Sequence, residues 1–369
     1  MKKIMCLILI LSTCFFGGCF NYNDIDKVIF ATCVLVDTDQ SGNPIIYVEG
    51  FKSDREVSPD AGSNQRLLFK GTGKTIFEVL RDIDMSSGYK VNYTNTKSIL
   101  FTEKAASSNL YDFIDFFSRD QELLIRSYIA VFHGDPEKFM NISFKSQEFI
   151  GMYIYNLASN FSPSSRTIIT TVNDFLNAVY SKSKTYVITM VHVKTESKEP
   201  KIELANGAII KGSKMIDILS DQDGLGYNFL IDNIKGGSLE VTNPNSPDKY
   251  AALEILKSRT TTHIDYSGKN IKLKKIINIK LSLAEAQNCI NLNRKTIEVL
   301  QNEAENNIKF YCMDLFNKYK IKNIDIFNIK NDIYKKYPKI NIQDPIKQTS
   351  LDIEVNAKIE GSSIQTNFR

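Results

Sequence analysis

A cysteine near the start of the chain has the surroundings of a lipid-attachment site. Two lysines precede an apolar run over residues 4–16, and Gly17-Gly18-Cys19 ends it. A basic start, a short apolar middle and small residues before the cut are typical of a secretory signal. The run is shorter than the roughly 20 apolar residues that span a membrane. We therefore predict a cleaved signal peptide over residues 1–18 and a thioether-linked diacylglycerol on Cys19.

Alternatives to this anchor stay open. Cys19 could be incidental in an ordinary secreted protein, or the segment could persist as an uncleaved helix. Phe16 stands where lipoprotein signals usually carry leucine, and a second frame, Leu11-Ser12-Thr13-Cys14, has the leucine but places threonine beside the cut. The small residue before Cys19 favours Cys19 as the anchor of a bacterial lipoprotein.

A glycine-rich stretch, Gly71-Thr72-Gly73-Lys74-Thr75, invites a phosphate-binding interpretation. The spacing excludes it, because the phosphate-loop motif needs a glycine five residues before Gly73, where the chain has Leu68. Thr75 and Glu78 instead form a capping-box pattern, followed by apolar residues at helical spacing. The stretch predicts the start of a helix.

The residues of common hydrolases are missing from the sequence. His133, His192 and His263 are far apart and form no zinc-binding pair, and there is neither a G-x-S-x-G elbow nor an S-x-x-K motif with its companions. Acidic residues alternate with lysines, as on solvated faces. A paired-carboxylate site stays open, since its partners can be remote in sequence. We expect no enzyme activity, no metal and no cofactor besides the covalent lipid.

The mature chain keeps three further cysteines, Cys33, Cys289 and Cys312. This odd number gives no disulfide framework. Cys289 and Cys312 could pair, but Cys312 falls on the expected buried face of a helix, which favours a buried thiol.

The charge and length of the chain limit the classes of protein to which it can belong. The net charge falls from +4 to +2 when Lys2 and Lys3 are removed, and the charges are dispersed, so we expect no nucleic-acid partner. The sequence after the signal has no second long apolar run. Its length suggests two or three domains, forming a body tethered outside a membrane.

The N-terminal region, residues 19–195, has an α/β rhythm of one lobe or two, with a split near 134–165. We expect a hairpin over residues 27–36 and 45–51 and strands over 97–102, 126–132 and 185–193. Helices are expected over residues 76–88, 109–117 and 147–160, and two more begin after the caps Asp135 and Thr171.

The polar residues 196–200 are the preferred boundary to a C-terminal α/β domain, residues 196–369. There, Asn206-Gly207 predicts a hairpin turn. Residues 215–219 and 225–234 are expected to be helical, the second after a capping pattern of Ser220 with Asp223. Residues 239–241, 251–258, 271–283 and 351–359 are expected to be strands. A helix over 294–319 carries an apolar stripe, which packs more often on its own sheet than on a partner: Ile297, Leu300, Ala304, Ile308, Tyr311 and Leu315.

Several motifs follow one another in an order that resembles one known family. They are Cys19-Phe20-Asn21-Tyr22-Asn23-Asp24-Ile25, Gly73-Lys74-Thr75-Ile76-Phe77-Glu78 with Arg81, Phe116-Phe117-Ser118-Arg119-Asp120, residues 208–211, Gly224-Leu225-Gly226 leading to Lys235-Gly236-Gly237, Asp325-Ile326-Phe327, Tyr334-Lys335-Lys336-Tyr337-Pro338, and the closing strand 353–359. The chain resembles the Ger(x)C family, the lipoprotein C subunits of spore germinant receptors. Phe20 and Asn21 depart from the Trp-Asp of its opening motif.

The resemblance implies an α/β protein of three lobes without assigned catalytic activity. It implies a place on the outer face of the spore's inner membrane, beside a permease-like B subunit and an A subunit. We therefore expect a receptor subunit that acts by protein contacts. The alternative is a solute-binding lipoprotein that captures a small molecule in a cleft, for which Arg81, Arg126 and Asp120 are candidate lining residues.

Overall fold

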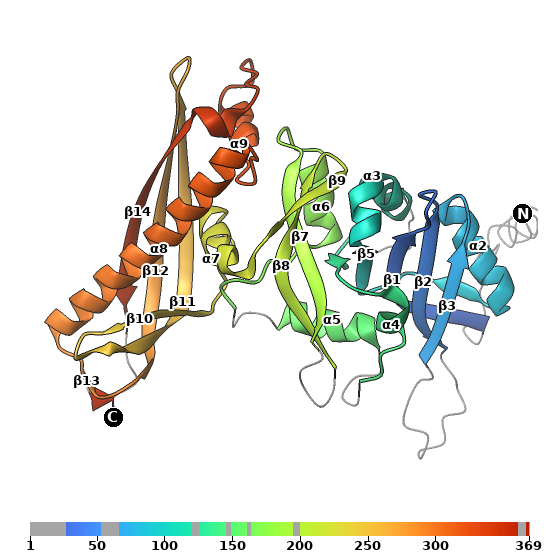
Figure 1. The fold of residues 1–369 in the computed structure, drawn as a ribbon, viewed down its shortest axis with the longest axis horizontal. Helices are drawn as coiled ribbons and strands as arrows, with labels where there is room; N and C mark the ends of the chain where they lie inside the picture. The colour runs from blue at the N-terminus through green and yellow to red at the C-terminus, as the bar shows by residue number, and fades with distance from the viewer. Residues whose placement is uncertain are drawn as a thin grey trace, which may run out of the picture.

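Two β-sheets covered by helices follow one another along the long axis of the molecule (Figure 1). The computed structural model describes residues 27–52, 66–119, 125–144, 149–160, 164–194, 200–360 and 367–368. Both sheets combine parallel and antiparallel pairs, and helices pack on them. This architecture confirms the predicted mixed α/β class.

The first sheet joins nine of the described strands. The hairpin predicted near the N-terminus forms its β1 and β2. Parallel pairs run from β1 through β5 and β6 to β7, and the flanking strands are antiparallel. In spatial order the strands are β3 (Arg66–Thr72), β2 (Pro44–Lys52), β1 (Val28–Thr38), β5 (Ser98–Thr102), β6 (Tyr128–Phe132), β7 (Thr185–Lys194), β8 (Lys201–Lys211) and β9 (Lys214–Leu219), with β4 (Lys90–Asn92) beside β1.

Helices cover both faces of this sheet because its central strands are apolar on both sides. One face packs against α2 (Ile76–Ser87), α3 (Glu103–Arg119) and α6 (Val172–Val179). The opposite face packs against α4 (Pro136–Met140) and α5 (Ile150–Ser159). Side-chain caps predicted from the sequence begin three of these helices, at Thr75, Asp135 and Thr171.

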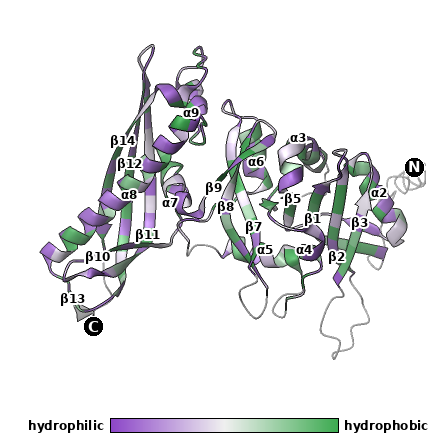
Figure 2. Cartoon of the chain, in the orientation of Figure 1, coloured by the Kyte–Doolittle hydropathy of each residue, from purple (hydrophilic) through white to green (hydrophobic). Residues whose placement is uncertain are grey.

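The second sheet is made of long strands with one wet face. Its order is β10 (Ser238–Asn243), β11 (Ser246–Tyr266), β12 (Ile271–Ala286) and β14 (Thr349–Ile359). The described chain also has a short pair, β13 (Ile290–Asn291) and β15 (Asn367–Phe368). Figure 2 shows hydrophilic and hydrophobic residues alternating in this part of the chain, and β12 has the predicted alternation except at Lys275, which is buried.

The long helix α8 (Arg294–Lys322) packs on β14 and β10, as the apolar stripe predicts. Leu300, Ala304, Ile308 and Leu315 are buried, whereas Tyr311 is 39% exposed and Cys312 takes its place on the buried face. Two shorter helices complete this domain, α7 (Asp221–Leu230) and α9 (Ile329–Lys336), together with a 3₁₀ turn at Pro345–Gln348.

Two predicted elements are wrong. Asn206-Gly207 does not turn the chain but forms a bulge inside the continuous strand β8, where Asn206 alone of the pair has a left-handed φ of 64°. Gly207 is required by packing, since an added Cβ would lie 2.4 Å from Val187 Cγ1. Residues 215–219 lie in the edge strand β9 and not in a helix, with alternating burial set by its pairing to β8.

The sheet runs across both proposed divisions of the chain. Strands β7 and β8 pair with each other although residues 196–200 separate them, and β6 and β7 pair although residues 134–165 lie between them. In the described structure the second sheet begins only after α7. The sheet therefore extends the N-terminal unit to about β9, and the predicted boundary at 195/196 falls within that sheet.

Candidate functional site

A cleft of about 620 Å³ opens where the two sheet units meet. One wall comes from the ends of α5 and α6 with neighbouring strands, including Asp174, Phe175 and Tyr186. The facing wall comes from α7 and the turn after it, including Tyr227 and Lys235. Its volume is in the range of small-molecule sites, so this cleft is the first place to look for a ligand.

Most polar side chains that line the cleft form hydrogen bonds within the protein. The Asp174 carboxylate accepts hydrogen bonds from the Thr171 amide and hydroxyl, at 3.0 and 2.7 Å, and so caps α6. Asp232 Oδ1 accepts from the Thr260 amide at 2.6 Å, and Asn328 Oδ1 accepts from a serine hydroxyl at 3.1 Å. These hydrogen bonds stabilise the walls of the cleft. Fewer polar groups are therefore left to bind a solute.

Close backbone contacts hold α7 between the two units. A Cβ added at Gly224 would lie 2.1 Å from Arg166 O, and one added at Gly226 would lie 2.6 Å from Tyr311 O, so both faces of α7 need glycine. The buried amide of Asn228 donates to Ser165 O and to Thr167 O, at 3.0 Å each. The floor of the cleft is therefore tightly packed, with α7 held between the segment around Arg166 and the helix α8.

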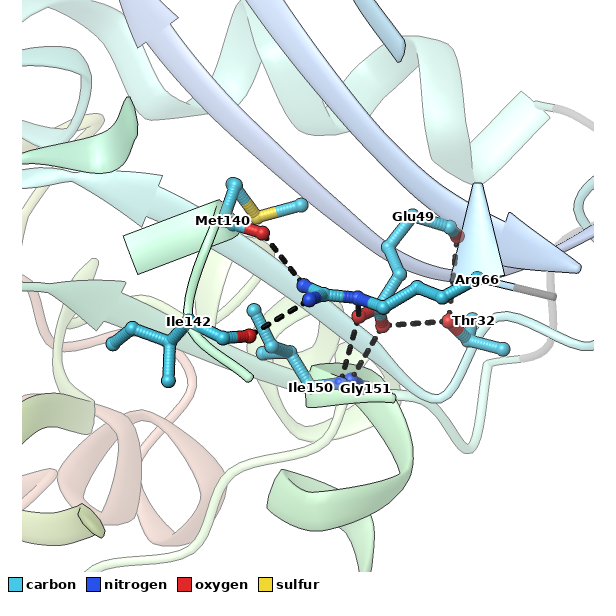
Figure 3. A network of polar contacts seen from close by, with 7 residues as sticks. All are labelled: Thr32, Glu49, Arg66, Met140, Ile142, Ile150 and Gly151. Atoms are coloured by element: carbon cyan, nitrogen blue, oxygen red, sulfur yellow. Dashed lines mark hydrogen bonds and ion pairs between the residues drawn. The ribbon is translucent and has the colours of Figure 1, made fainter. Parts of the chain in front are cut away.

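A buried ion pair organises the N-terminal sheet (Figure 3). Glu49 on β2 has a fully buried side chain, and its carboxylate lies 2.7 Å from Arg66 Nε on β3. The same carboxylate accepts from the Thr32 hydroxyl at 2.7 Å and from the first two amides of α5, Ile150 and Gly151, at 2.8 and 2.9 Å. A helix N-terminus favours such an anion.

The guanidinium of Arg66 completes this network. It donates to Ile142 O at 2.7 Å and to Met140 O at 2.6 Å, in the segment that joins α4 to α5. One buried pair thus ties three strands to the helices on one face of the sheet. Sequence reasoning missed the pair. The available signal was a glutamate inside the otherwise apolar strand of residues 45–51.

Two histidines that are distant in sequence meet at the edge of the parallel strands. The rings of His133, which follows β6, and His192 on β7 have centroids 5.4 Å apart. His133 Nδ1 lies 3.0 Å from Glu103 Oε2. Burial, and then the charge of His133, lower the pKa of His192. In the part of the chain that the structure describes, no group of three or more His, Cys, Asp and Glu side chains is arranged to hold a metal ion.

The other sequence candidates lie apart from the cleft. Arg81 is on the exposed face of α2 and Arg126 is exposed before β6; neither lines the cleft. Asp120 and Cys19 lie outside the described residues. Gly73-Lys74-Thr75 begins α2, where Glu78 N donates to Thr75 Oγ1 at 3.2 Å and Lys74 N donates to Glu78 Oε2 at 2.8 Å.

Three cysteines lie within the described residues. Cys33 and Cys312 are buried and Cys289 is exposed, and all three are free thiols. The buried thiol predicted at Cys312 is confirmed, and the alternative pairing with Cys289 is not formed. Within the described ranges, no helix is both long and apolar enough to cross a membrane.

Comparison with known proteins identifies the family. The model for the spore germination protein N-terminal domain matches residues 21–193, and the model for the spore germination B3/GerAC-like C-terminal domain matches residues 205–363. The chain belongs to the Ger(x)C family of spore germination proteins. The two matches meet near the boundary predicted from the sequence, although the sheet continues through it.

Relatives of the Ger(x)C chain span most of its length. Spore germination protein GerQC of Bacillus cereus is 22% identical over 88% of this chain and 88% of its own. Spore germination protein B3 of Bacillus subtilis (strain 168) is 24% identical over 66% of this chain and 64% of its own. The crystal structure of the GerBC protein has the same fold, with a TM-score of 0.57 at 18% identity, covering 89% of this chain and 97% of that one.

Several Ger(x)C motif residues have structural roles here. Gly224 and Gly226 allow the close approach of α7 to its two neighbours, and Gly237, at a φ of 108°, lies against Ser165 N. The buried Asp325 accepts from the amides of Ile329 and Lys330 and so holds the start of α9. These motif residues therefore hold α7 between its two neighbours and stabilise the start of α9.

Proposed function

We propose that this chain is the lipid-anchored C subunit of a nutrient germinant receptor and acts through contacts with other subunits. Its partners would be an A subunit and a permease-like B subunit, at the outer face of the spore's inner membrane. The observation that carries the proposal is the pair of family matches over residues 21–193 and 205–363. The proposed anchor, Cys19, stands two residues before the first of them.

The placement of the acidic groups supports contact over catalysis. Glu49 and Asp325, two buried carboxylates, are both consumed by bonds that hold helix starts. A catalytic carboxyl would need reach to a substrate. Neither of these two buried groups is placed to act on a substrate, which supports the proposal of a subunit that works by contact.

Deletion of the gene tests the function. Spores without it should form in normal yield but respond weakly or not at all to the nutrients that this receptor senses, and a wild-type copy should restore the response. A normal response of the deletion strain to every nutrient that triggers the parent would contradict the proposal.

Mass spectrometry of the mature N-terminus tests the anchor. We expect a first peptide that begins at a lipid-modified Cys19. A mature chain that begins at any other residue, or an unmodified Cys19, would overturn this part of the proposal. Capture of the membrane-extracted protein with an A and a B subunit, and not with an unrelated permease, tests the partners.

A second candidate function is direct capture of a small molecule, and the cleft between the sheet units is the observation that favours it. Calorimetry of residues 21–369 with amino acids and sugars tests it. Saturable binding that Lys235→Ala at the cleft weakens, and that Lys249→Ala away from the cleft leaves intact, would establish capture. No heat with any nutrient that triggers the spore would leave contact as the function.

A further inference from the structure

The outer face of α2 carries an exposed stripe of two apolar side chains and one cation. Phe77 is 56% exposed and Met85 is 74% exposed. Arg81 lies between them at helical spacing, with its guanidinium carbon 5.1 Å from the centroid of the Phe77 ring. The buried face of the same helix is formed by Ile76, Val79, Leu80 and Ile83. Phe77 also lies against Phe116 of α3, with ring centroids 6.2 Å apart. The stripe is the part of α2 that this packing leaves exposed.

The stripe lies where the chain leads toward its proposed anchor. Val28, the first residue of β1, pairs with Lys90, two residues after Gly88 ends α2. The Met85 end of the helix is therefore beside the point from which the chain runs back to Cys19. Figure 1 places α2 at the end of the molecule opposite the second sheet.

The length of the connection limits how far this end can be from the lipid. Residues 20–26 separate Cys19 from Lys27. Eight residue steps span at most about 28 Å when fully extended. The twelve-residue α2 is about 18 Å long. A lipid-anchored Cys19 therefore keeps the whole of α2 within reach of the membrane surface.

We propose that Phe77, Arg81 and Met85 rest on the lipid headgroups, so that α2 is the membrane-facing side of the body. The inference rests on the proposed lipid anchor. The phenyl ring and the thioether suit the boundary between headgroups and acyl chains, and the guanidinium suits a lipid phosphate. Lys27, which is exposed just before β1, adds positive charge near the Met85 end.

Three acidic residues of α2 flank the stripe, Glu78 and Asp82 on one side and Asp84 on the other. Asp84 accepts a hydrogen bond from the Val91 amide at 3.0 Å and so is bonded within the fold. Glu78 is already bonded to the Lys74 amide at the helix start. The stripe adds little to the strength of a diacylglycerol anchor. It determines which way the body faces, and so which surface is left for the other subunits.

The chain has no tryptophan, so a single introduced tryptophan reports its own surroundings. The test uses the lipidated full chain in vesicles of phosphatidylglycerol and phosphatidylcholine that contain brominated phosphatidylcholine, with Phe77→Trp as the reporter and Met85→Trp as a second one. The matched control is Tyr250→Trp: Tyr250 is 59% exposed and lies in β11 of the second sheet, far from α2 in Figure 1.

We expect brominated lipid to quench Phe77→Trp and Met85→Trp by about half or more, because an interfacial side chain lies roughly 5–10 Å deep, and to leave Tyr250→Trp unquenched. Equal quenching of the three variants would overturn the inference. So would protection of both α2 reporters from brominated lipid and from aqueous acrylamide in the assembled receptor, since that result would place another protein on the stripe.

Vesicle flotation separates this inference from the proposed function. Protein that floats with vesicles through Cys19 while its α2 reporters stay unquenched would refute the membrane-facing stripe and leave the anchor intact. Protein that does not float would refute both, since the stripe depends on the anchor.

Discussion

Replacement of Glu49 by glutamine should remove a large part of the stability of the N-terminal sheet. The carboxylate accepts four hydrogen bonds, two at each oxygen, from Arg66, Ile150, Thr32 and Gly151. A glutamine amide has one acceptor oxygen, so two of these donors would face an NH₂ group in either orientation. The partly buried Arg66 would also lose its counter-charge.

The expected cost follows from the burial of the pair. Breaking a buried ion pair by removing one partner costs about 3–5 kcal/mol, against a total free energy of unfolding of about 5–15 kcal/mol for a domain. The matched control is Glu137→Gln. Glu137 pairs with Lys70 at 2.6 Å, but both side chains are about half exposed, so its loss should cost about 0–1 kcal/mol.

Urea unfolding of residues 21–369, followed by circular dichroism, measures both losses. A Glu49→Gln variant that loses no more stability than Glu137→Gln would refute the structural role given to the network. Arg66→Met combined with Glu49→Gln should lose less than the two single changes together, because the double variant leaves no unpaired charge.

Three further outcomes are expected. In native residues 21–369 a thiol reagent should react quickly with Cys289 alone, because burial raises the pKa of the other two thiols; a second fast thiol would contradict their burial. Burial lowers the pKa of the Lys275 amine in the folded chain, so unfolding takes up a proton at pH values between this lowered pKa and the ordinary lysine pKa of about 10.4. Lys275→Met should therefore stabilise more at pH 7 than at pH 10, and a gain independent of pH in urea unfolding would count against this. Gly224→Ala should lower the thermal unfolding midpoint despite the helix preference of alanine, since its Cβ would meet Arg166 O; a rise would show that α7 can move away.

Local chemistry made the helix starts predictable from sequence. A cap depends on residues three positions apart, and Thr75, Asp135, Thr171 and Ser220 all cap helices in the structure. Alternating apolar residues likewise predicted β12 and β14, because one face of their sheet is wet.

Tertiary packing decided the elements that sequence reasoning missed. Asn206-Gly207 has the composition of a tight turn, but pairing on both sides of β8 keeps the strand continuous and turns the pair into a bulge. Glu49 and Arg66 are 17 residues apart, and the partners of Glu49 at the start of α5 are about a hundred residues further along the chain. No local pattern links groups at that distance. The two histidines that meet beside Glu103 were missed for the same reason.

Some candidate functional residues belong to a local sequence pattern, and others are brought together only by the fold. The signal layout around Cys19 is a local pattern, so an anchor could be predicted from sequence alone. The cleft between the sheet units and the stripe on α2 depend on how distant segments pack, and the structure was needed to find them.

Nutrient germination of spores that carry Cys19→Ala tests the central claim most directly. The gene is deleted and restored as wild type, as Cys19→Ala, or as Cys14→Ala, which changes the competing cysteine of the signal. Loss of optical density after nutrient addition is the readout. We expect Cys14→Ala to germinate as wild type and Cys19→Ala to respond as weakly as the deletion, with equal spore yields. Wild-type germination of Cys19→Ala spores would contradict a receptor subunit that works from a lipid anchor.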